Sequence, residues 1–531
     1  MTAAKDLQEQ VPAHTLRAAI AHGRMNRRAW IVTGMLVVFQ IINFADKAVL
    51  GLVAGPAMRE LQLSAGEFGF IGSAFFFLFA IAAVGVGFLA GRVPTRWILL
   101  TMGVSWAVLQ FPMLFGGGAA VLLVTRILLG GAEGPATPIT LQHVHGWFPA
   151  RERGLPSSMV AIGSTLGPII AAPVLAGIIA HPELGWRWAF GFLGIVGLVW
   201  SAVWFLVGRD GPYSHSRART GASGAAGLGA ADSGSAVSGQ APSEAALSGA
   251  DDGAPGTVAA GEDPASYAGG EGAEADPADR VRSTLRGGRG SVADVADLLG
   301  VVPILRVIGS RMFVIAVLAG AGCFWAQGFL TTWAPQYLAA AVELPPGAIG
   351  LVSTFPWVLG ALALLALGYA SRFLMRRGVT VRWALGALFG ATLLASGVCF
   401  LVLPAVDGVV AVGVMTVGAG LAMIYPLAPT AVAFTVCSRQ RAAVMATLTG
   451  LASIGGVVSP AMVGLLMDSA GYVPAPKGQP VPVEMVMALI DGMNSAFWMI
   501  GLYLLVVGAA SILMLNPDRT AHRLQRFAYN G

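Results

Sequence analysis

The chain has 531 residues, of which 56 % are apolar and 11 % are charged, and its formal net charge is +5 at pH 7. So small a charged fraction excludes an ordinary soluble globular protein, in which about a quarter of the residues are charged. The positive charge does not indicate a nucleic acid partner, because the basic residues lie in short loops between long apolar runs. The composition therefore predicts a membrane protein.

The first half of the chain contains a polar start and six apolar runs. We expect residues 1–29 to form a cytoplasmic N-terminal tail without a cleavable signal peptide, and residues 30–208 to form a six-helix bundle. Each run can cross the bilayer as a helix, which takes about 20 residues, and is too long for a barrel strand. The predicted spans are residues 30–53, 67–90, 97–115, 119–144, 156–180 and 187–208.

A long segment rich in Gly, Ala, Ser, Asp and Glu separates these runs from six more. Residues 209–305 contain few large apolar side chains, so we predict a disordered cytoplasmic linker. Residues 306–516 are expected to form a second six-helix bundle, and residues 517–531 a cytoplasmic C-terminal tail. The further spans are predicted at residues 311–338, 347–370, 382–403, 408–434, 442–467 and 492–515.

Two sets of six helices joined by a linker indicate an internal duplication. The predicted fold is an all-α membrane protein with 12 transmembrane helices in two pseudo-symmetric six-helix bundles. Transporters built from such repeats place their substrate site near the middle of the bilayer, where the two halves meet. The basic loop GRVPTRW (91–97) after the second span recurs as SRFLMRRG (371–378) after the eighth, which supports the repeat.

Basic residues in the loops predict the orientation of the chain. The loops on the side of both termini carry ten arginines, whereas the opposite loops carry only Arg59, Arg187 and Lys477. Because basic loops face the cytoplasm, we expect a multi-pass protein of the cell (inner) membrane with both termini cytoplasmic. The ten arginines are Arg92, Arg96, Arg151, Arg153, Arg372, Arg376, Arg377, Arg382, Arg439 and Arg441.

Four charged residues lie inside predicted spans, namely Asp46 and Lys47 on the first and Arg126 and Glu133 on the fourth. A charge in the middle of a span costs about 2.5 to 3.5 kcal/mol, so these residues must be paired or hydrated. Helical geometry predicts Asp46 and Arg126 at one depth, and Glu133 about two turns deeper on the face of Arg126. They form either two ion pairs that hold the helices together, or a proton relay beside an anion site.

The sequence has no motif for catalysis, metal binding or cofactor binding. Cys323, Cys399 and Cys437 lack metal-ligand spacing, and no nucleotide-binding or hydrolase motif occurs. We therefore expect no enzyme activity, no metal and no cofactor.

The run RILLGGAEGPATP (126–138), followed by GWFPARERG (146–154), resembles the fourth helix and the following loop of anion:cation symporters in the major facilitator superfamily. NFADKAVL (43–50) is similar to the first-helix signature of that family, and GWRWAF (185–190) to the start of its sixth helix. TTWAPQYL (331–338) and GGVVSP (455–460) are similar to its seventh and eleventh helices. The resemblance implies transport of a small organic anion, in most bacterial members together with protons.

The resemblance also implies roles for the four buried charges. Asp46 and Glu133 match acidic residues implicated in proton coupling, and Arg126 matches the residue implicated in holding the substrate carboxylate. Lys47 stands where Arg is usual, which keeps the positive charge but loses the planar two-pronged donor group. We therefore expect Arg126 and Lys47 to bind the substrate anion.

Several positions where family members are more polar indicate the class of substrate. They are Phe44 and Phe79, where Tyr is common, and Thr449 and Ser453, where sugar-acid carriers tend to have Asn. An unpaired buried hydroxyl costs about 1 to 3 kcal/mol, so a polyhydroxylated sugar acid needs many polar partners. We expect an aromatic or modestly hydroxylated carboxylate, with Gln327 and Tyr425 as further contributors to its site.

A proton-driven exporter of drugs or metabolites has the same fold and is the alternative function. Its neutral or cationic cargo would not need a buried Arg and Lys, which favour an anion. We expect a monomer whose partners are a small organic anion, protons and membrane lipid. Gly91 and Arg372 replace the acidic residues usual in two cytoplasmic loops, so the cytoplasmic gate is either held differently or looser.

Overall fold

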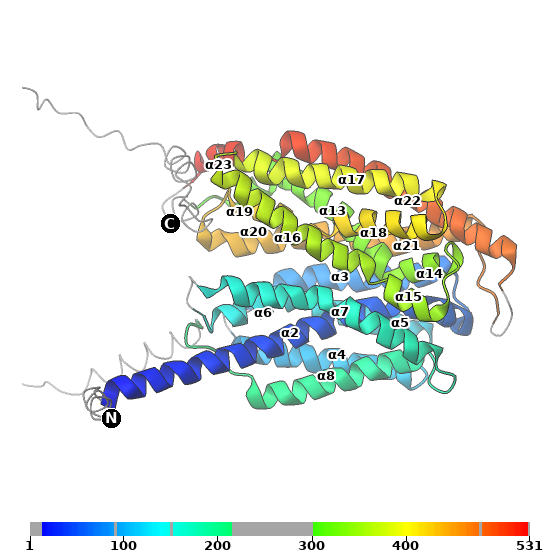
Figure 1. The fold of residues 1–531 in the computed structure, drawn as a ribbon, viewed down its shortest axis with the longest axis horizontal. Coiled ribbons are helices and arrows are strands. Elements are labelled where there is room, and N and C mark those ends of the chain that lie inside the picture. The colour runs from blue at the N-terminus through cyan, green and yellow to red at the C-terminus, as the bar shows by residue number, and fades with distance from the viewer. Residues whose placement is uncertain (1–12, 90–92, 149–151, 215–300, 477–480, 529–531) are drawn as a thin grey trace, which may run out of the picture.

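The computed structural model describes residues 13–89, 93–148, 152–214, 301–476 and 481–528. Within these ranges every regular element is a helix, and twelve helical segments are long and apolar enough to cross a membrane. The predicted all-α fold with 12 spans is confirmed. The two halves of the chain form separate bundles that lie side by side (Figure 1).

The N-terminal bundle contains six spans, of which the fourth is broken in two. The break falls at Gly134 and Pro135, because proline lacks the N–H that would continue the helical hydrogen bonds. The first helix begins at Ala13, inside the range assigned to the polar tail. The helices are α2 (Ala13–Leu61), α3 (Ala65–Leu89), α4 (Thr95–Leu114), α5 (Ala119–Glu133), α6 (Ala136–His145), α7 (Gly154–Ala180) and α8 (Arg187–Val207).

The C-terminal bundle repeats this plan, and its tenth span breaks before Pro426, at the position equivalent to the break in the fourth. Such breaks are tolerated in a membrane where the freed backbone groups line a cavity. The elements are α12 (Ile304–Ile308), α13 (Arg311–Thr332), α14 (Ala334–Ala340), α15 (Pro346–Val352), α16 (Phe355–Arg376), η2 (Arg382–Ala387), α17 (Leu388–Val402), η3 (Leu403–Ala405), α18 (Gly408–Ala422), α19 (Leu427–Ala433), α20 (Ser438–Ala452), α21 (Ile454–Ser469), α22 (Val483–Met514) and α23 (Pro517–Gln525).

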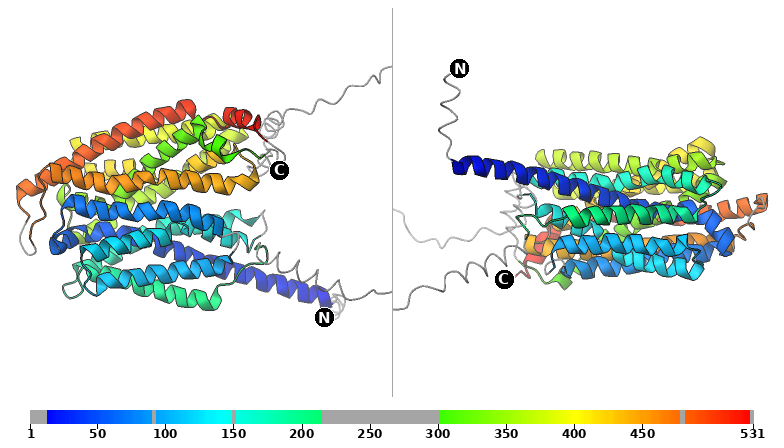
Figure 2. Two further views of the ribbon diagram at one scale, coloured as in Figure 1. Left: turned by 180° about the vertical axis from the view of Figure 1, so that it is seen from behind. Right: turned by 90° about the horizontal axis from the view of Figure 1, so that it is seen from below.

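The start of α2 and helix α23 lie at the same end of the molecule, which we call the terminal end (Figure 2). Each bundle has an even number of spans, so the chain enters and leaves it at that end. The other end is called the opposite end.

The two bundles touch most closely where α3 crosses α21. Glycines allow this contact, because a Cβ on Gly69 would lie 2.2 Å from the carbonyl oxygen of Pro460. A Cβ on Gly464 would likewise lie 2.2 Å from the carbonyl oxygen of Ala65. The backbones of the two helices therefore pack directly against each other.

The described ends of the linker are attached to the bundles. The indole N–H of Trp147 donates to the carbonyl oxygen of Arg209 at 3.1 Å, and the N–H of Tyr213 donates to that of Gly146 at 2.9 Å. At the other end, the N–H of Val302 donates to Oε1 of Gln440 at 2.9 Å. Residues at both edges of the predicted linker thus belong to the folded bundles, whereas residues 215–300 lie outside the described ranges.

Candidate functional site

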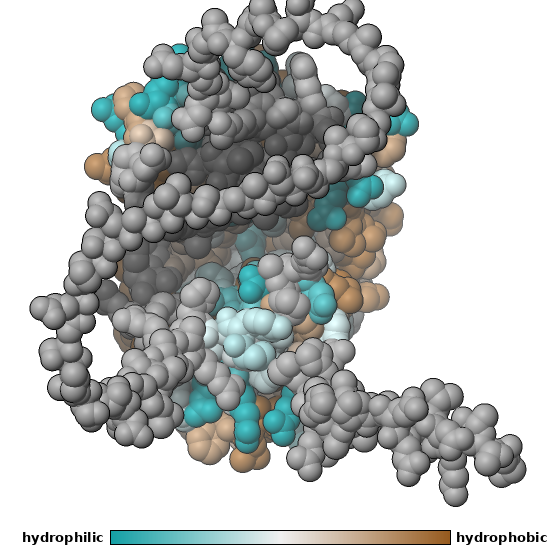
Figure 3. Space-filling view, turned by 90° about the vertical axis from the view of Figure 1, so that its left-hand side faces the viewer, coloured by the Kyte–Doolittle hydropathy of each residue, from teal (hydrophilic) through white to brown (hydrophobic). Residues whose placement is uncertain are grey.

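A cavity of about 2500 Å³ lies between the two bundles. Arg28, Arg153 and Arg441 line its mouth at the terminal end, and it reaches Lys47 and Glu133 in the middle of the spans. Figure 3 views the molecule from this end, where hydrophilic side chains are spread over several parts of the face and hydrophobic ones lie mainly on one flank. The cavity is therefore a vestibule that leads from one side of the protein to its centre.

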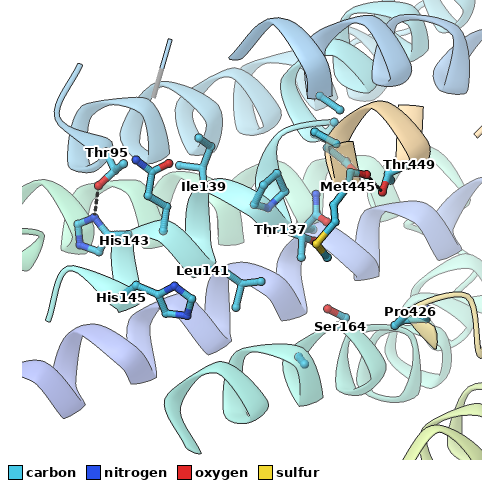
Figure 4. A pocket seen from close by; sticks show the side chains of 18 of the residues that line it. Thr95, Thr137, Ile139, Leu141, His143, His145, Ser164, Pro426, Met445 and Thr449 are labelled. Atoms are coloured by element: carbon cyan, nitrogen blue, oxygen red, sulfur yellow. Dashed lines mark hydrogen bonds between the residues drawn. The ribbon is translucent and has the colours of Figure 1, made fainter. Parts of the chain in front are cut away.

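Both bundles contribute to the walls of this cavity. Thr137 on α6 and Ser164 on α7 face it from the N-terminal bundle, and Pro426 and Thr449 face it from the C-terminal bundle (Figure 4). A ligand in the cavity would touch both halves. Its binding would therefore depend on how the halves are placed relative to each other.

Lys47 and Glu133 form a buried ion pair on the cavity wall. The Nζ atom of Lys47 lies 2.5 Å from Oε2 of Glu133, and the exposed fractions of the two residues are 9 % and 1 %. The Lys47 ammonium also donates to Oδ1 of Asn43 at 2.8 Å, one turn earlier on α2. In the part of the chain that the structure describes, no donor is recorded for Oε1 of Glu133. The pair places a cation and an acid beside the cavity.

Asp46 and Arg126 form a second pair, at one depth as helical spacing predicts. Nη1 of Arg126 lies 3.7 Å from Oδ1 of Asp46. Gln110 on α4 bridges them, because its amide donates to Asp46 at 2.6 Å and accepts from Arg126 at 3.4 Å. None of these three residues is among those that line the cavity. Helices α2 and α5 are thus joined by two ion pairs, and in this state only one of them borders the cavity.

Aromatic side chains surround the Lys47 ammonium. Its Nζ lies 4.5 Å from the centre of the Phe44 ring and 6.0 Å from that of Phe79, both of which line the cavity. Phe44 meets Trp357 of the C-terminal bundle edge to face, with ring centres 6.3 Å apart. Aromatic faces attract cations, so the rings hold the ammonium while offering an apolar surface to a ligand.

The C-terminal bundle brings three of its four predicted site residues to the cavity. Gln327, Tyr425 and Thr449 line it, and the Tyr425 hydroxyl donates to Oγ1 of Thr449 at 3.0 Å. Ser453 is fully buried outside the lining, and its hydroxyl donates to the carbonyl oxygen of Gly450 at 2.8 Å. The hydroxyl of Ser453 is already paired with the last turn of α20, so it does not face a ligand in this state.

Sequence reasoning missed a polar cluster on the other side of the cavity. The amide of Gln40 donates to Thr137 at 3.1 Å and to Ser164 at 3.2 Å, and its buried Oε1 has no partner among the described residues. In the sequence, this cluster was indicated only by individual polar residues, Gln40, Thr137 and Ser164, within largely apolar spans. Together with Asn43, these groups provide a small polar area beside Lys47.

The opposite end is closed by contacts between the bundles. The carboxylate of Asp468, at the end of α21, accepts from the N–H groups of Ala65 and Gly66 at 3.0 and 2.8 Å and from the Ser64 hydroxyl at 2.8 Å. These donors form the N-terminus of α3, where a negative charge is stabilised. Asp468 therefore ties the two halves together.

Replacing Asp468 by Asn is expected to open this end more often. The variant loses the negative charge, and the N–H donors of its amide would face the backbone N–H donors at the start of α3. Hydrogen bonds to a charged group contribute about 1.5 to 3 kcal/mol, so the open population should rise roughly tenfold or more. Spin labels on Phe115→Cys and Val409→Cys, in a background without native cysteines, would report the distance between the bundles. These two positions are exposed at the opposite end.

Asp491→Asn is the matched control, because it removes an exposed acid from the same end. Its distance distribution should equal that of the parent protein. An unchanged distribution in the Asp468 variant would show that this carboxylate does not hold the bundles closed.

Comparisons with known proteins agree with this architecture. The sequence model of the family described as Major Facilitator Superfamily matches residues 36–460. The chain is similar to the "Probable sulfoacetate transporter SauU" of Cupriavidus necator, with 29 % identity over 35 % of this chain and 43 % of that protein. It is also similar to the "Probable galactarate/D-glucarate transporter GudP" of Escherichia coli K12, with 32 % identity over 36 % of this chain and 43 % of that protein.

The aligned regions thus span less than half the length of these two relatives. In overall structure, the chain is similar to a bacterial homologue of the human lysosomal transporter Spinster in an inward-facing, unoccupied conformation. The TM-score is 0.65, with 16 % sequence identity, over 95 % of this chain and 99 % of that one. Because the sequence identity is this low, the similarity supports a shared fold and nothing more specific.

Proposed function

Because the chain belongs to the Major Facilitator Superfamily, a family of membrane transporters, we propose that it takes up an organic carboxylate anion together with protons by alternating access. The observation that carries the proposal is the Lys47–Glu133 pair on the cavity wall. A lysine paired with an acid is free to bind an anion once that acid is neutralised by a proton. Proton and anion then enter the same site together.

The proposed cycle uses both ion pairs. With the opposite end open, protons bind Glu133 and Asp46, and the substrate carboxylate binds Arg126 and Lys47. The halves then rock to the state described here, with the cavity open at the terminal end. Proton release restores the Lys47–Glu133 pair, which displaces the anion. Arg126 is covered in this state, so its contact with substrate belongs to the state that is open at the opposite end.

We place the terminal end in the cytoplasm, because loops at that end carry most of the basic residues. The described state is then inward-open. With this orientation, proton entry from outside drives the anion inwards. Symport of one proton with a monoanion would be electroneutral. Symport of two protons would move one net positive charge inwards, and the membrane potential would then add about 2.3 kcal/mol per 100 mV to the driving force for uptake.

The lining of the cavity supports an aromatic or modestly hydroxylated acid as substrate. Phe44, Phe79 and Trp357 offer ring faces around Lys47, and polar side chains such as Thr137, Ser164 and Gln327 complete the lining. A polyhydroxylated acid would leave several of its hydroxyls against aromatic carbon, and each would cost about 1 to 3 kcal/mol. The two relatives are named as transporters of sulfoacetate and of galactarate or D-glucarate, which are small organic anions, and this supports a small anion as the substrate.

Uptake into proteoliposomes tests the proposal. Purified protein is reconstituted and offered radiolabelled benzoate-type, monohydroxylated and sugar acids with an acidic exterior. We expect accumulation of at least one aromatic or monohydroxylated acid above its outside concentration, and loss of that accumulation when a protonophore is added. Accumulation that is indifferent to the proton gradient would refute proton symport.

The same panel separates uptake of an anion from the alternative of a drug exporter. Amide or ester analogues, which lack the carboxylate, should neither be accumulated nor compete with the acid, because Lys47 then has no anion to bind. Competition by neutral or cationic compounds at comparable concentrations would favour the exporter. Liposomes without protein provide the background.

A further inference from the structure

The charges of the C-terminal bundle are sorted between its two ends. In the part of the chain that the structure describes, the acids at the opposite end are Glu343, Asp407, Asp468, Glu484 and Asp491, whereas Asp518 is the one acid at the terminal end. Every arginine of the bundle lies at the terminal end. We define the basic face as Arg306, Arg372, Arg376, Arg377, Arg382, Arg519, Arg523 and Arg526.

Helix α23 joins the parts of this face. It is strongly amphipathic, with Ala521 and Leu524 buried against the bundle and Arg523 exposed. It contacts η2, which in turn contacts the end of α16. The guanidinium of Arg306 lies 4.7 Å from the ring centre of Phe527, just beyond α23. The arginines of α12, α16, η2 and α23 therefore form one continuous surface.

Arginines on this face lie against exposed aromatic rings. The guanidinium of Arg377 lies 4.3 Å from the centre of the Phe373 ring, and that of Arg382 lies 5.3 Å from the Trp383 ring. Trp383 is 54 % exposed and Leu305 on α12 is 78 % exposed. Exposed aromatic and aliphatic side chains beside arginines at the end of a span are typical of the boundary between hydrocarbon and headgroups.

The guanidinium groups of this face exceed the acceptors that the described residues provide. The Nε of Arg382 is buried and has no hydrogen-bond partner within the described ranges. Arg372, Arg376 and Arg377 are exposed within six residues of one another and have no ion pair among those that the structure records. Arginine binds phosphate through paired N–H donors, so a layer of phosphate groups would complete this surface.

We propose that the basic face binds the headgroups of anionic phospholipids in the leaflet at the terminal end. The exposed rings place the face at the depth of the headgroups, and the arginines provide charge and donors for their phosphates. The N-terminal bundle has a mixture of Arg and acidic residues at this end, including Glu152 and Asp210. The lipid interaction is therefore centred on the C-terminal bundle.

Thermal unfolding of the full-length protein in mixed micelles tests this proposal. Phosphatidylglycerol, titrated into detergent that contains phosphatidylcholine, should raise the melting temperature of the parent protein. The triple variant Arg372→Gln/Arg376→Gln/Arg377→Gln should need a much higher phosphatidylglycerol concentration for half of that rise. Each arginine near an anionic surface contributes roughly fivefold in affinity, so the triple variant is expected to shift the midpoint about 100-fold.

Two variants serve as controls. The triple Lys variant of the same positions keeps the charge and should retain most of the lipid effect, and Arg59→Gln, at the opposite end, should leave it unchanged. Equal melting curves of the Gln variant and the parent across the titration would overturn the proposal. So would an equal rise with inorganic phosphate in phosphatidylcholine micelles, because the face would then bind free anions. The measurement does not depend on transport, so it is independent of the proposed function.

Discussion

Replacing Glu133 by Gln is expected to abolish proton-driven accumulation of substrate while sparing exchange across the membrane. Gln keeps the shape of the side chain and an oxygen for Lys47, but it has no proton to release. Each coupled proton supports about tenfold accumulation per pH unit of gradient. The variant should therefore equilibrate its substrate and never concentrate it, which radiolabel uptake under an acid-outside gradient would measure.

The exchange measurement makes this result specific. Liposomes loaded with unlabelled substrate should still exchange it for label in the Glu133→Gln variant, because Lys47 remains on the cavity wall. Glu133→Asp restores an acid on a shorter side chain and should recover part of the accumulation. Full accumulation by Glu133→Gln would exclude Glu133 from proton coupling, and loss of exchange as well would point to misfolding.

Replacing Lys47 by Met is expected to weaken substrate binding roughly 30-fold or more. Removing one member of a buried charge interaction costs about 2 to 5 kcal/mol, and Lys47 is the cation that faces the cavity next to Glu133. The same change leaves the Glu133 carboxylate buried without its counter-charge, which destabilises a protein by about 3 to 5 kcal/mol. Ligand-induced shifts of the melting temperature would measure binding, and the unliganded melting temperature would measure stability.

A double variant separates these two effects. Lys47→Met/Glu133→Gln removes both charges, so its stability should return towards that of the parent, because a neutral pair often replaces a buried ion pair at little cost. Substrate binding should stay weak, whereas Lys47→Arg should bind substrate well. Recovery of binding in the double variant would mean that Lys47 acts only as the partner of Glu133.

Helical spacing predicted the geometry of one of the two buried ion pairs. The positions of Asp46 and Arg126 along their spans gave their common depth, and the structure places the two side chains 3.7 Å apart. The partner of Glu133 was harder to predict, because the long side chain of Lys47 reaches along the helix to a level different from that of its own backbone. Gln110 bridges Asp46 and Arg126, but in the sequence it is only a single polar residue within an apolar span, so its role could not be predicted.

Which residues border the cavity could not be predicted from the sequence, because that depends on the conformational state. Arg126 and Ser453 lie on the helices expected to form the site, yet neither lines the cavity when the opposite end is closed. The limits of the linker were also difficult to predict. Residues 209–214 contain no large aliphatic side chain, like most of the linker, yet hydrogen bonds with Gly146 and Trp147 in the loop after α6 hold them in place.

The cavity also determines where the membrane voltage acts. When the cavity is filled with electrolyte, the aqueous solution of the terminal side reaches Lys47 and Glu133. The membrane potential then falls mainly across the closed part of the protein between these residues and the opposite end, which Asp468 helps to hold closed. A net charge that crosses this thin layer gains or loses about 2.3 kcal/mol per 100 mV. The voltage-dependent step is then the rocking of the bundles and not the diffusion of ions through the mouth, and transient currents should follow the rate of that motion.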